Sequence, residues 1–122
     1  MNPIGIALGD IDGDHKPDLL VAHDGVNFFS VFMNTSVQGS IGSGSFAPRM
    51  DFSTTGPLWG INLADIDGDI KQDVIVANNT LTAISVFRNI SVPGIINPGS
   101  FESRVDYTTL NNPDHIAVGD ID

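Results

Sequence analysis

The stretch Asp10-Ile-Asp-Gly-Asp-His-Lys-Pro-Asp18 places four carboxylates at positions 1, 3, 5 and 9 of one short segment. At a separation of about 4 Å and an effective dielectric constant of roughly 20, each pair of like charges costs on the order of 4 kcal/mol. The segment supplies a single lysine, which is too little positive charge to offset four carboxylates. The pattern therefore predicts that a cation binds among these aspartates.

This stretch belongs to a repeat. It recurs 55 residues later as Asp65-Ile-Asp-Gly-Asp-Ile-Lys-Gln-Asp73, and a third copy begins at Asp120-Ile-Asp122. Two other pairs of segments keep the same offset without an insertion, namely Ser30–Asn34 with Ser85–Asn89 and Gly44–Phe52 with Gly99–Tyr107. A fixed period of this kind indicates a repeat architecture. We therefore expect a first repeat over residues 1–57, a second over 58–112 and the truncated start of a third over 113–122.

Each repeat contains four short apolar or alternating runs typical of strands. These are Ile4–Leu8, Leu19–Ala22, Phe28–Asn34 and Phe46–Phe52, then Ile61–Leu63, Val74–Ala77, Thr82–Asn89 and Phe101–Tyr107. No window has a helical stripe. Four antiparallel strands at a period of roughly 50 residues are typical of a β-propeller blade, whereas the turns of the rival architecture, a β-solenoid, are usually much shorter. The sequence predicts an all-β fold of two four-stranded antiparallel blades.

Aromatic residues recur at the same offset. The pairs are Phe32 and Phe87, Phe46 and Phe101, and Phe52 and Tyr107. We expect them to fill the core between the blades.

Composition narrows the classes of partner. The net charge is −10, and ten of the fifteen acidic residues lie in the three aspartate clusters. Five Lys and Arg residues cannot form the basic surface that nucleic-acid binding requires. No apolar run approaches the ~18 residues of a membrane span, and the N-terminus lacks a signal-peptide pattern. We expect the chain to be a piece of a longer, secreted repeat array.

Ile-Ala-Leu-Gly-Asp-Ile-Asp-Gly-Asp-x-Lys-Pro-Asp-Leu-Leu-Val-Ala, over residues 6–22, together with the later Val-Phe-x-Asn, resembles the FG-GAP/VCBS-type repeat of integrin-α-like β-propellers. The resemblance covers both repeats. It implies blades of extracellular propellers in which the loop between the first two strands binds calcium. The implied ligands are the carboxylates of Asp10, Asp12, Asp14 and Asp18 with the Lys16 carbonyl, and those of Asp65, Asp67, Asp69 and Asp73 with the Lys71 carbonyl.

The sixth loop position departs from this family, which usually has glycine there. Here it holds His15 and Ile70. A β-branched residue is costly at positive φ, so we expect the second loop to bind calcium more weakly. An EF-hand fails because its twelfth position, a glutamate, is a strand valine here, and Mg²⁺ prefers fewer carboxylates and more waters. Aspartates also form Asx turns on solvated surfaces, but two identically spaced loops favour a metal.

These features predict a calcium-binding, non-catalytic module that acts as an extracellular or cell-surface interaction or adhesion scaffold for a protein or glycan ligand. No cysteine, Gly-x-Ser-x-Gly elbow or Ser/His/Asp set suggests catalysis. The alternatives are a lectin-like propeller, with Trp59 as a sugar platform instead of a packing residue, and an accessory region of a secreted enzyme. Because two blades cannot close a ring, we expect self-association, as a head-to-tail ring or by strand exchange between Pro3–Asp12 and Pro113–Asp122.

Overall fold

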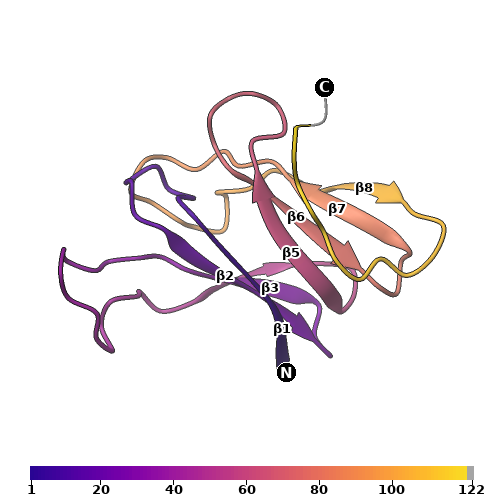
Figure 1. The fold of residues 1–122 in the computed structure, drawn as a ribbon, viewed down its shortest axis with the longest axis horizontal. Helices are drawn as coiled ribbons and strands as arrows, with labels where there is room; N and C mark the ends of the chain where they lie inside the picture. Colours follow the sequence, from indigo (N-terminus) through magenta and orange to yellow (C-terminus); the bar gives the residue numbers. More distant parts are fainter. Residues whose placement is uncertain (121–122) are drawn as a thin grey trace.

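The computed structural model describes residues 1–120, which form two sheets and no helix. The first sheet has the order β1 (Asn2–Gly9), β2 (Asp18–Asp24), β3 (Phe28–Phe32) and β4 (Met50–Ser53). The second has the order β5 (Leu58–Ala64), β6 (Asp73–Asn78), β7 (Ala83–Phe87) and β8 (Val105–Thr108). All neighbouring strands are antiparallel (Figure 1). The predicted all-β class with four-stranded antiparallel sheets is confirmed. In this part of the chain no helix has the length and apolar character needed to cross a membrane.

Both aspartate loops are hairpin connections between the first two strands of a sheet. Gly9 pairs with Asp18 at the end of the first hairpin, and Ala64 pairs with Asp73 at the end of the second. Antiparallel pairing therefore brings the first and last aspartate of each loop to adjacent points of the sheet. Position 9 of the loop is the first residue of the following strand, one residue before the predicted start of that strand.

The third and fourth strands of each sheet are shorter than predicted. β3 ends at Phe32 and β4 begins at Met50, and between them Asn34 and Phe46 form an isolated bridge. The Asn34 backbone N–H donates to the Asp18 carboxylate at 2.8 Å instead of continuing the ladder. The second sheet repeats this arrangement, with a bridge between residues 89 and 101. The strands end early because these asparagines hold the aspartate loops.

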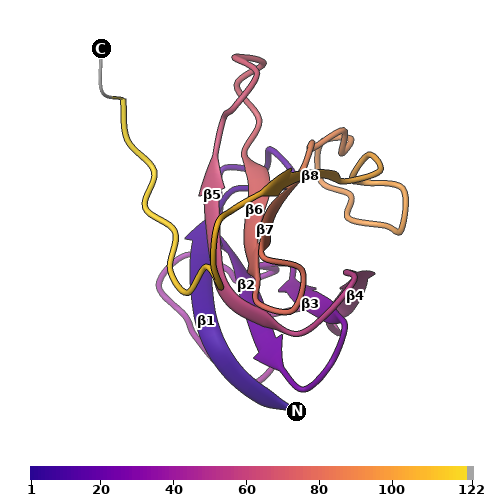
Figure 2. The same cartoon turned by 90° about the vertical axis from the view of Figure 1, so that its right-hand side faces the viewer.

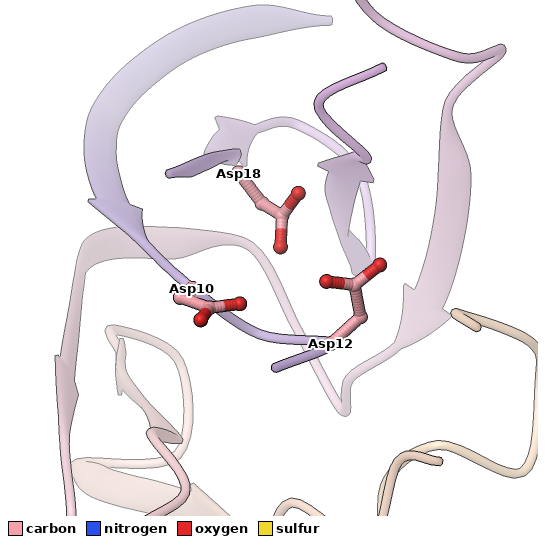
Figure 3. A group of neighbouring side chains, drawn as sticks. All are labelled: Asp10, Asp12 and Asp18. Atoms are coloured by element: carbon pink, nitrogen blue, oxygen red, sulfur yellow. The ribbon is translucent and has the colours of Figure 1, made fainter. Parts of the chain in front are cut away.

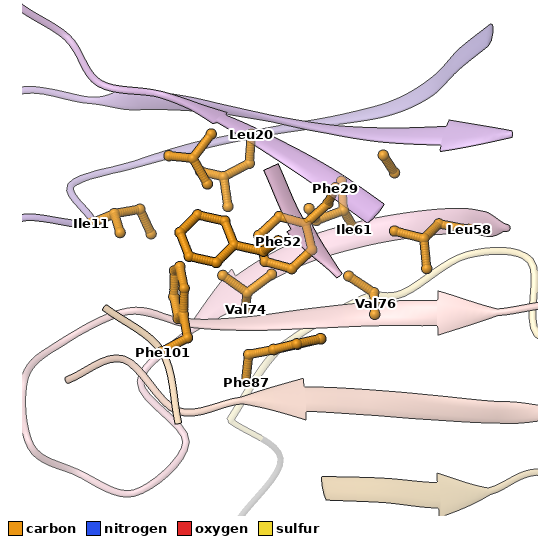
Figure 4. Close-up of a cluster of buried hydrophobic side chains, with 12 residues drawn as sticks. Ile11, Leu20, Phe29, Phe52, Leu58, Ile61, Val74, Val76, Phe87 and Phe101 are labelled. Carbon is orange, nitrogen blue, oxygen red and sulfur yellow. The ribbon is translucent and has the colours of Figure 1, made fainter. Parts of the chain in front are cut away.

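The two sheets pack side by side through their first strands. β1 lies along β5, and β2 also contacts β5 (Figure 2). The buried core lies between the sheets and includes four phenylalanines at their interface (Figure 4). Phe29 and Phe52 stack with ring centroids 5.3 Å apart, and the Phe101 ring meets Phe52 edge-on at 4.8 Å. Full burial of one such side chain stabilises the fold by about 1.5–3 kcal/mol.

The prediction that all six recurring aromatic residues fill this core is only partly correct. Phe52, Phe87 and Phe101 are buried in it, whereas Phe32 and Phe46 are half-buried. The prediction is wrong for Tyr107, because 54% of this residue is exposed. It lies on β8, on the sheet that no third sheet covers within residues 1–120.

The start of the third repeat runs along the second sheet. Residues 113–120 form no strand; the segment starts beside β5 and then runs away from it toward the C-terminus (Figures 1 and 2). The Asn62 side-chain amide donates to the Ile116 carbonyl at 3.1 Å. The start of the third repeat therefore contacts β5 near residues 114–116. Asp122 lies outside the described residues.

Candidate metal centre

Each aspartate loop curls around its own first carboxylate. The Asp10 side chain accepts hydrogen bonds from the backbone N–H groups of Gly13 at 2.7 Å, Asp14 at 3.1 Å and His15 at 2.8 Å. Asp65 accepts the same three bonds in the second loop, at 2.7, 3.1 and 2.9 Å. The identical spacing in the sequence thus produces the same local fold twice.

The sixth position of both loops is left-handed. His15 has φ 68° and Ile70 has φ 75°. Histidine is one of the residues found more often in this region, whereas a β-branched residue is an outlier there. A non-glycine residue held in this conformation costs on the order of 1–3 kcal/mol. The second loop therefore carries the backbone strain that the sequence suggested.

The last aspartate of each loop fastens the loop to the sheet. Asp18 is fully buried, and its two oxygens accept from the N–H groups of Ile11 at 2.9 Å and Asn34 at 2.8 Å. Asp73 accepts from the equivalent residues, Ile66 at 3.0 Å and Asn89 at 2.8 Å. These carboxylates join the loop to the end of the third strand.

Three of the four predicted carboxylates converge in each loop. Asp10, Asp12 and Asp18 each offer an oxygen within 4.8 Å of the others (Figure 3), and Asp65, Asp67 and Asp73 form the second group. Asp14 and Asp69 do not belong to these groups. Asp14 Oδ1 accepts from the Lys16 backbone N–H at 2.8 Å, and its Oδ2 lies 3.2 Å from the Lys16 ammonium. The carbonyls of Lys16 and Lys71 stay predictions as ligands.

The first group contains a buried carboxylate, that of Asp12. Asp12 is only 2% exposed, and burial, followed by the nearby charges of Asp18 and Asp14, raises its pKa. Asp12 Oδ1 accepts from the Asp14 N–H at 3.2 Å. Burial also raises the pKa of Asp18. Buried carboxylate charges this close together are unfavourable, and Ca²⁺, which takes oxygen ligands, fits this set of donors.

Asp12 is buried because the second sheet covers the first loop. Asn89 Nδ2 and Ser91 Oγ both donate to the Ile11 carbonyl, at 2.9 and 2.7 Å. The Gly94 N–H donates to the Asp12 carbonyl at 2.8 Å. A cavity of about 360 Å³ lies beside the loop, between it and residues 70–72, 91 and 93. The first site thus depends on contacts between the two sheets and is open to an ion from this cavity.

The second loop has a different environment. Asp67 is exposed, and Arg88, which follows β7, donates to it through Nε. Arg88 Nη2 also lies 3.1 Å from Asp69 Oδ2. The hydrogen bond from Arg88 lowers the pKa of Asp67, in contrast to the raised pKa of Asp12. This contact was not predicted from the sequence. The two repeats differ at this position, because Met33 of the first repeat is the equivalent of Arg88, and this difference was the available sign of it.

The structure also brings together a histidine, a serine and an aspartate that sequence reasoning did not identify as a set. His23 Nε2 lies 2.9 Å from Ser30 Oγ, and Ser30 Oγ donates to Asp51 at 2.6 Å. In a catalytic triad the carboxylate orients the histidine, whereas here it accepts from the serine. The second sheet repeats the serine–aspartate pair without a histidine, between Ser85 and Asp106 at 2.6 Å. The repetition indicates a cross-strand structural pair.

Trp59, the residue on which a sugar-binding alternative depends, lies at an irregularity of β5 between Leu58 and Gly60 and is half-exposed. It lines neither the cavity beside the first loop nor a second cavity of about 490 Å³ between β4 and residues 98–104. Its position therefore gives no support to a carbohydrate site.

Comparison with known proteins identifies the repeat. The family model of the FG-GAP-like repeat matches residues 10–76, which include both aspartate loops and most of β6. No curated protein and no solved structure matches the chain. FG-GAP repeats form β-propellers, commonly bind calcium and are typical of extracellular proteins. Since the match covers more than half of the 122 residues, the chain belongs to the FG-GAP-like repeat family and its two sheets are propeller blades.

Proposed function

We propose that the loop Asp10–Asp18 binds a calcium ion, and that the protein is a calcium-stabilised propeller module with a scaffolding instead of a catalytic role. The observation that carries this proposal is the buried carboxylate of Asp12, which converges with the carboxylates of Asp10 and Asp18. Ca²⁺ accepts six to eight oxygen ligands in flexible geometry, so the Lys16 carbonyl and water would complete the set. When bound, the ion supplies the positive charge that the loop lacks.

The role of such an ion is structural. It would be held by residues from the end of β1 and the start of β2, so its binding free energy would add to the stability of the blade. Extracellular calcium modules bind at about 10⁻⁴–10⁻³ M, which suits a calcium-rich exterior and not a resting cytosol. We therefore propose an extracellular or cell-surface setting, in which the blades present an interaction or adhesion surface to a protein or glycan.

A comparison of protein stability with and without calcium tests this proposal. We expect CaCl₂ at roughly 5 mM, well above the affinity range of extracellular modules, to raise the melting temperature relative to excess EDTA. Asp12→Asn keeps the Oδ1 acceptor and removes the charge, so it should abolish most of this shift. Asp67→Asn, the matched change in the second loop, should leave the shift intact. Equal melting temperatures of the wild-type protein in calcium and EDTA would refute the proposal.

We further propose that copies of the chain associate head to tail. Residues that are buried between the two blades have repeat equivalents that are exposed on the outer faces. The pairs are Ile61 (8% exposed) and Ile6 (65%), Ile11 (1%) and Ile66 (55%), and Phe52 (7%) and Tyr107 (54%). The first-blade face around Ile6 and the second-blade face around Ile66 therefore match the two sides of the contact that already exists within the chain.

A polar contact supports the same pairing. Asn34 Nδ2 donates to the Pro17 carbonyl at 2.9 Å, as Asn89 Nδ2 donates to the Gln72 carbonyl at 3.0 Å. Asn89 donates in addition to Ile11 of the other blade. In a head-to-tail pair, Asn34 of the incoming copy would donate to the Ile66 carbonyl of the copy that precedes it.

Docking of this kind implies an exchange of strands. Residues 114–116 already contact β5, where the first strand of a following blade would lie. An incoming copy brings its own version of that segment, Asn2–Gly9. The two segments cannot both occupy this position. The C-terminal segment differs from the other two copies in having His115 where they have Gly5 and Gly60. We therefore propose that the incoming β1 displaces residues 113–120.

Two charged variants test the assembly by light scattering. Ile6→Glu places a charge on one association face and Ile66→Glu places a charge on the other. Each variant alone should therefore be monomeric. An equimolar mixture retains one intact pair of faces and should form a heterodimer. A wild-type protein that stays monomeric at high concentration would overturn the head-to-tail proposal, and so would a mixture that shows no heterodimer.

A further inference from the structure

The second loop already contains a positively charged group from elsewhere in the protein. Arg88 lies just after β7, and its Nε donates to Asp67 Oδ2 while its Nη2 lies 3.1 Å from Asp69 Oδ2. Its remaining nitrogen, Nη1, lies 3.4 Å from Glu102. One guanidinium therefore joins two of the carboxylates that the repeat pattern assigns to calcium, and a third holds it in place.

The first loop has no such contact. Met33 occupies the repeat position of Arg88, so no guanidinium reaches Asp12. The Lys16 ammonium lies 3.2 Å from Asp14, but Asp14 is not one of the three convergent residues. Asp67, by contrast, belongs to the convergent group of its loop. Within residues 1–120, a side-chain cation from outside the loop contacts a convergent aspartate in the second loop and not in the first.

We propose that Arg88 is a tethered counter-ion that takes the place of calcium in the second loop, so that the chain binds a single calcium ion, at the first loop. This inference rests on the proposed function, because it assigns the metal to one of the two loops. Hydrogen bonds between arginine and carboxylate are strengthened by charge, and the planar guanidinium meets two acceptors at once. Asp67 already offers an oxygen to its convergent group, so calcium would have to compete with Arg88 for the negative charge of that carboxylate.

Two further features of the second loop act in the same direction. Ile70 holds a left-handed conformation that a bound ion would have to maintain. Ile66 and Asp67 are exposed, whereas Ile11 and Asp12 are covered by the second blade. A carboxylate that is exposed to water is solvated, so a bound ion stabilises it less than it stabilises a buried carboxylate. Arg88 thus keeps the second blade folded without metal, while the first blade depends on calcium.

The experiment measures calcium stoichiometry and affinity by isothermal titration with CaCl₂, with circular dichroism as the check on folding. Arg88→Met gives the second loop the residue that the first repeat has. Arg104→Met is the matched control, since it removes one arginine from the same blade, where its Nε lies 3.0 Å from Asp106 and away from the loop. Met33→Arg transfers the proposed counter-ion to the first loop and serves as an independent variant.

We expect one calcium ion per chain in the wild-type protein and in Arg104→Met, and two in Arg88→Met. The affinity of the second loop should rise at least about tenfold when Arg88 is removed, and that of the first should fall about tenfold in Met33→Arg. Two sites of similar affinity in the wild type would overturn the inference while leaving the proposed calcium function intact. So would an Arg88→Met variant that binds no more calcium than Arg104→Met.

The remaining outcomes separate the two proposals. If the wild type binds no calcium but Arg88→Met binds one ion, the counter-ion role is upheld and the first-loop calcium site is wrong. If neither protein binds calcium, both proposals are wrong. If Arg88→Met does not fold in EDTA, the tenfold loss expected in Met33→Arg decides the inference alone.

Discussion

The side-chain amide of Asn89, in the second blade, donates a hydrogen bond of 2.9 Å to the carbonyl oxygen of Ile11, in the aspartate loop of the first. The side-chain amide of Asn34, its repeat equivalent, donates within its own blade, to the Pro17 carbonyl at 2.9 Å. Asn89→Ala should therefore reduce the free energy of unfolding by about 0.5–1.5 kcal/mol more than Asn34→Ala, the value of one hydrogen bond. Urea denaturation at low protein concentration measures the difference. Equal losses would mean that the bond between the blades adds no stability.

A second prediction compares two aromatic residues that the repeat makes equivalent. Phe52 stacks on Phe29 in the core between the blades, whereas Tyr107 is exposed. Phe52→Ala should cost about 3–5 kcal/mol of stability, as expected for a large buried aromatic side chain. Tyr107→Ala should cost less than about 1 kcal/mol in the monomer but weaken head-to-tail association. Chemical denaturation measures the first effect and analytical ultracentrifugation the second. A large loss of monomer stability in Tyr107→Ala would contradict the exposed position of this residue.

Ile70 offers a stabilising substitution. Its side chain is 91% exposed and its φ is 75°, so Ile70→Gly removes backbone strain without a loss of packing. Relief of about 1–3 kcal/mol is partly offset by the greater freedom of glycine in the unfolded chain, which costs roughly 0.5–1 kcal/mol. We expect a net gain of about 1 kcal/mol in thermal or urea unfolding. His15→Gly is the control and should gain less, because histidine tolerates this region better. A less stable Ile70→Gly variant would show that Ile70 contributes a contact that outweighs its strain.

The stability of the protein should fall between about pH 7.5 and pH 5 because of His23. Burial, followed by the charge of Arg49, lowers the pKa of His23 from its usual 6.5. The unfolded chain therefore takes up a proton at this position more readily than the folded protein. The stability contributed by neutral His23 is complete above its unfolded-state pKa and is lost as the pH falls through the lower folded-state value. His23→Asn introduces the residue found at the buried equivalent position, Asn78. This variant should show a flatter dependence of unfolding free energy on pH, and an unchanged slope would exclude His23 as its source.

Much of the fold follows from the 55-residue period. The strand pairs around each aspartate loop were predictable because the apolar runs and the loop spacing occur twice. The lengths of the third and fourth strands were not, since Asn34 and Asn89 leave the ladder to bind Asp18 and Asp73, a contact between distant residues.

The two loops look equivalent in the sequence but differ in their surroundings. The convergence of Asp10, Asp12 and Asp18 was predictable from local spacing. The burial of Asp12 depends on the neighbouring blade, and the role of Arg88 depends on the direction in which its side chain leaves the end of β7. The 55-residue period makes Met33 and Arg88 equivalent positions. It therefore cannot distinguish the first loop, which no arginine side chain contacts within residues 1–120, from the second loop, which Arg88 contacts.

The most direct measurement is a crystal structure of the protein grown in CaCl₂ at millimolar concentration, with anomalous scattering collected to identify the metal. A calcium ion should lie among Asp10, Asp12 and Asp18, with carboxylate oxygens at about 2.3–2.6 Å from it. First-loop carboxylates that face only water molecules, with no metal between them, would contradict the proposed calcium site.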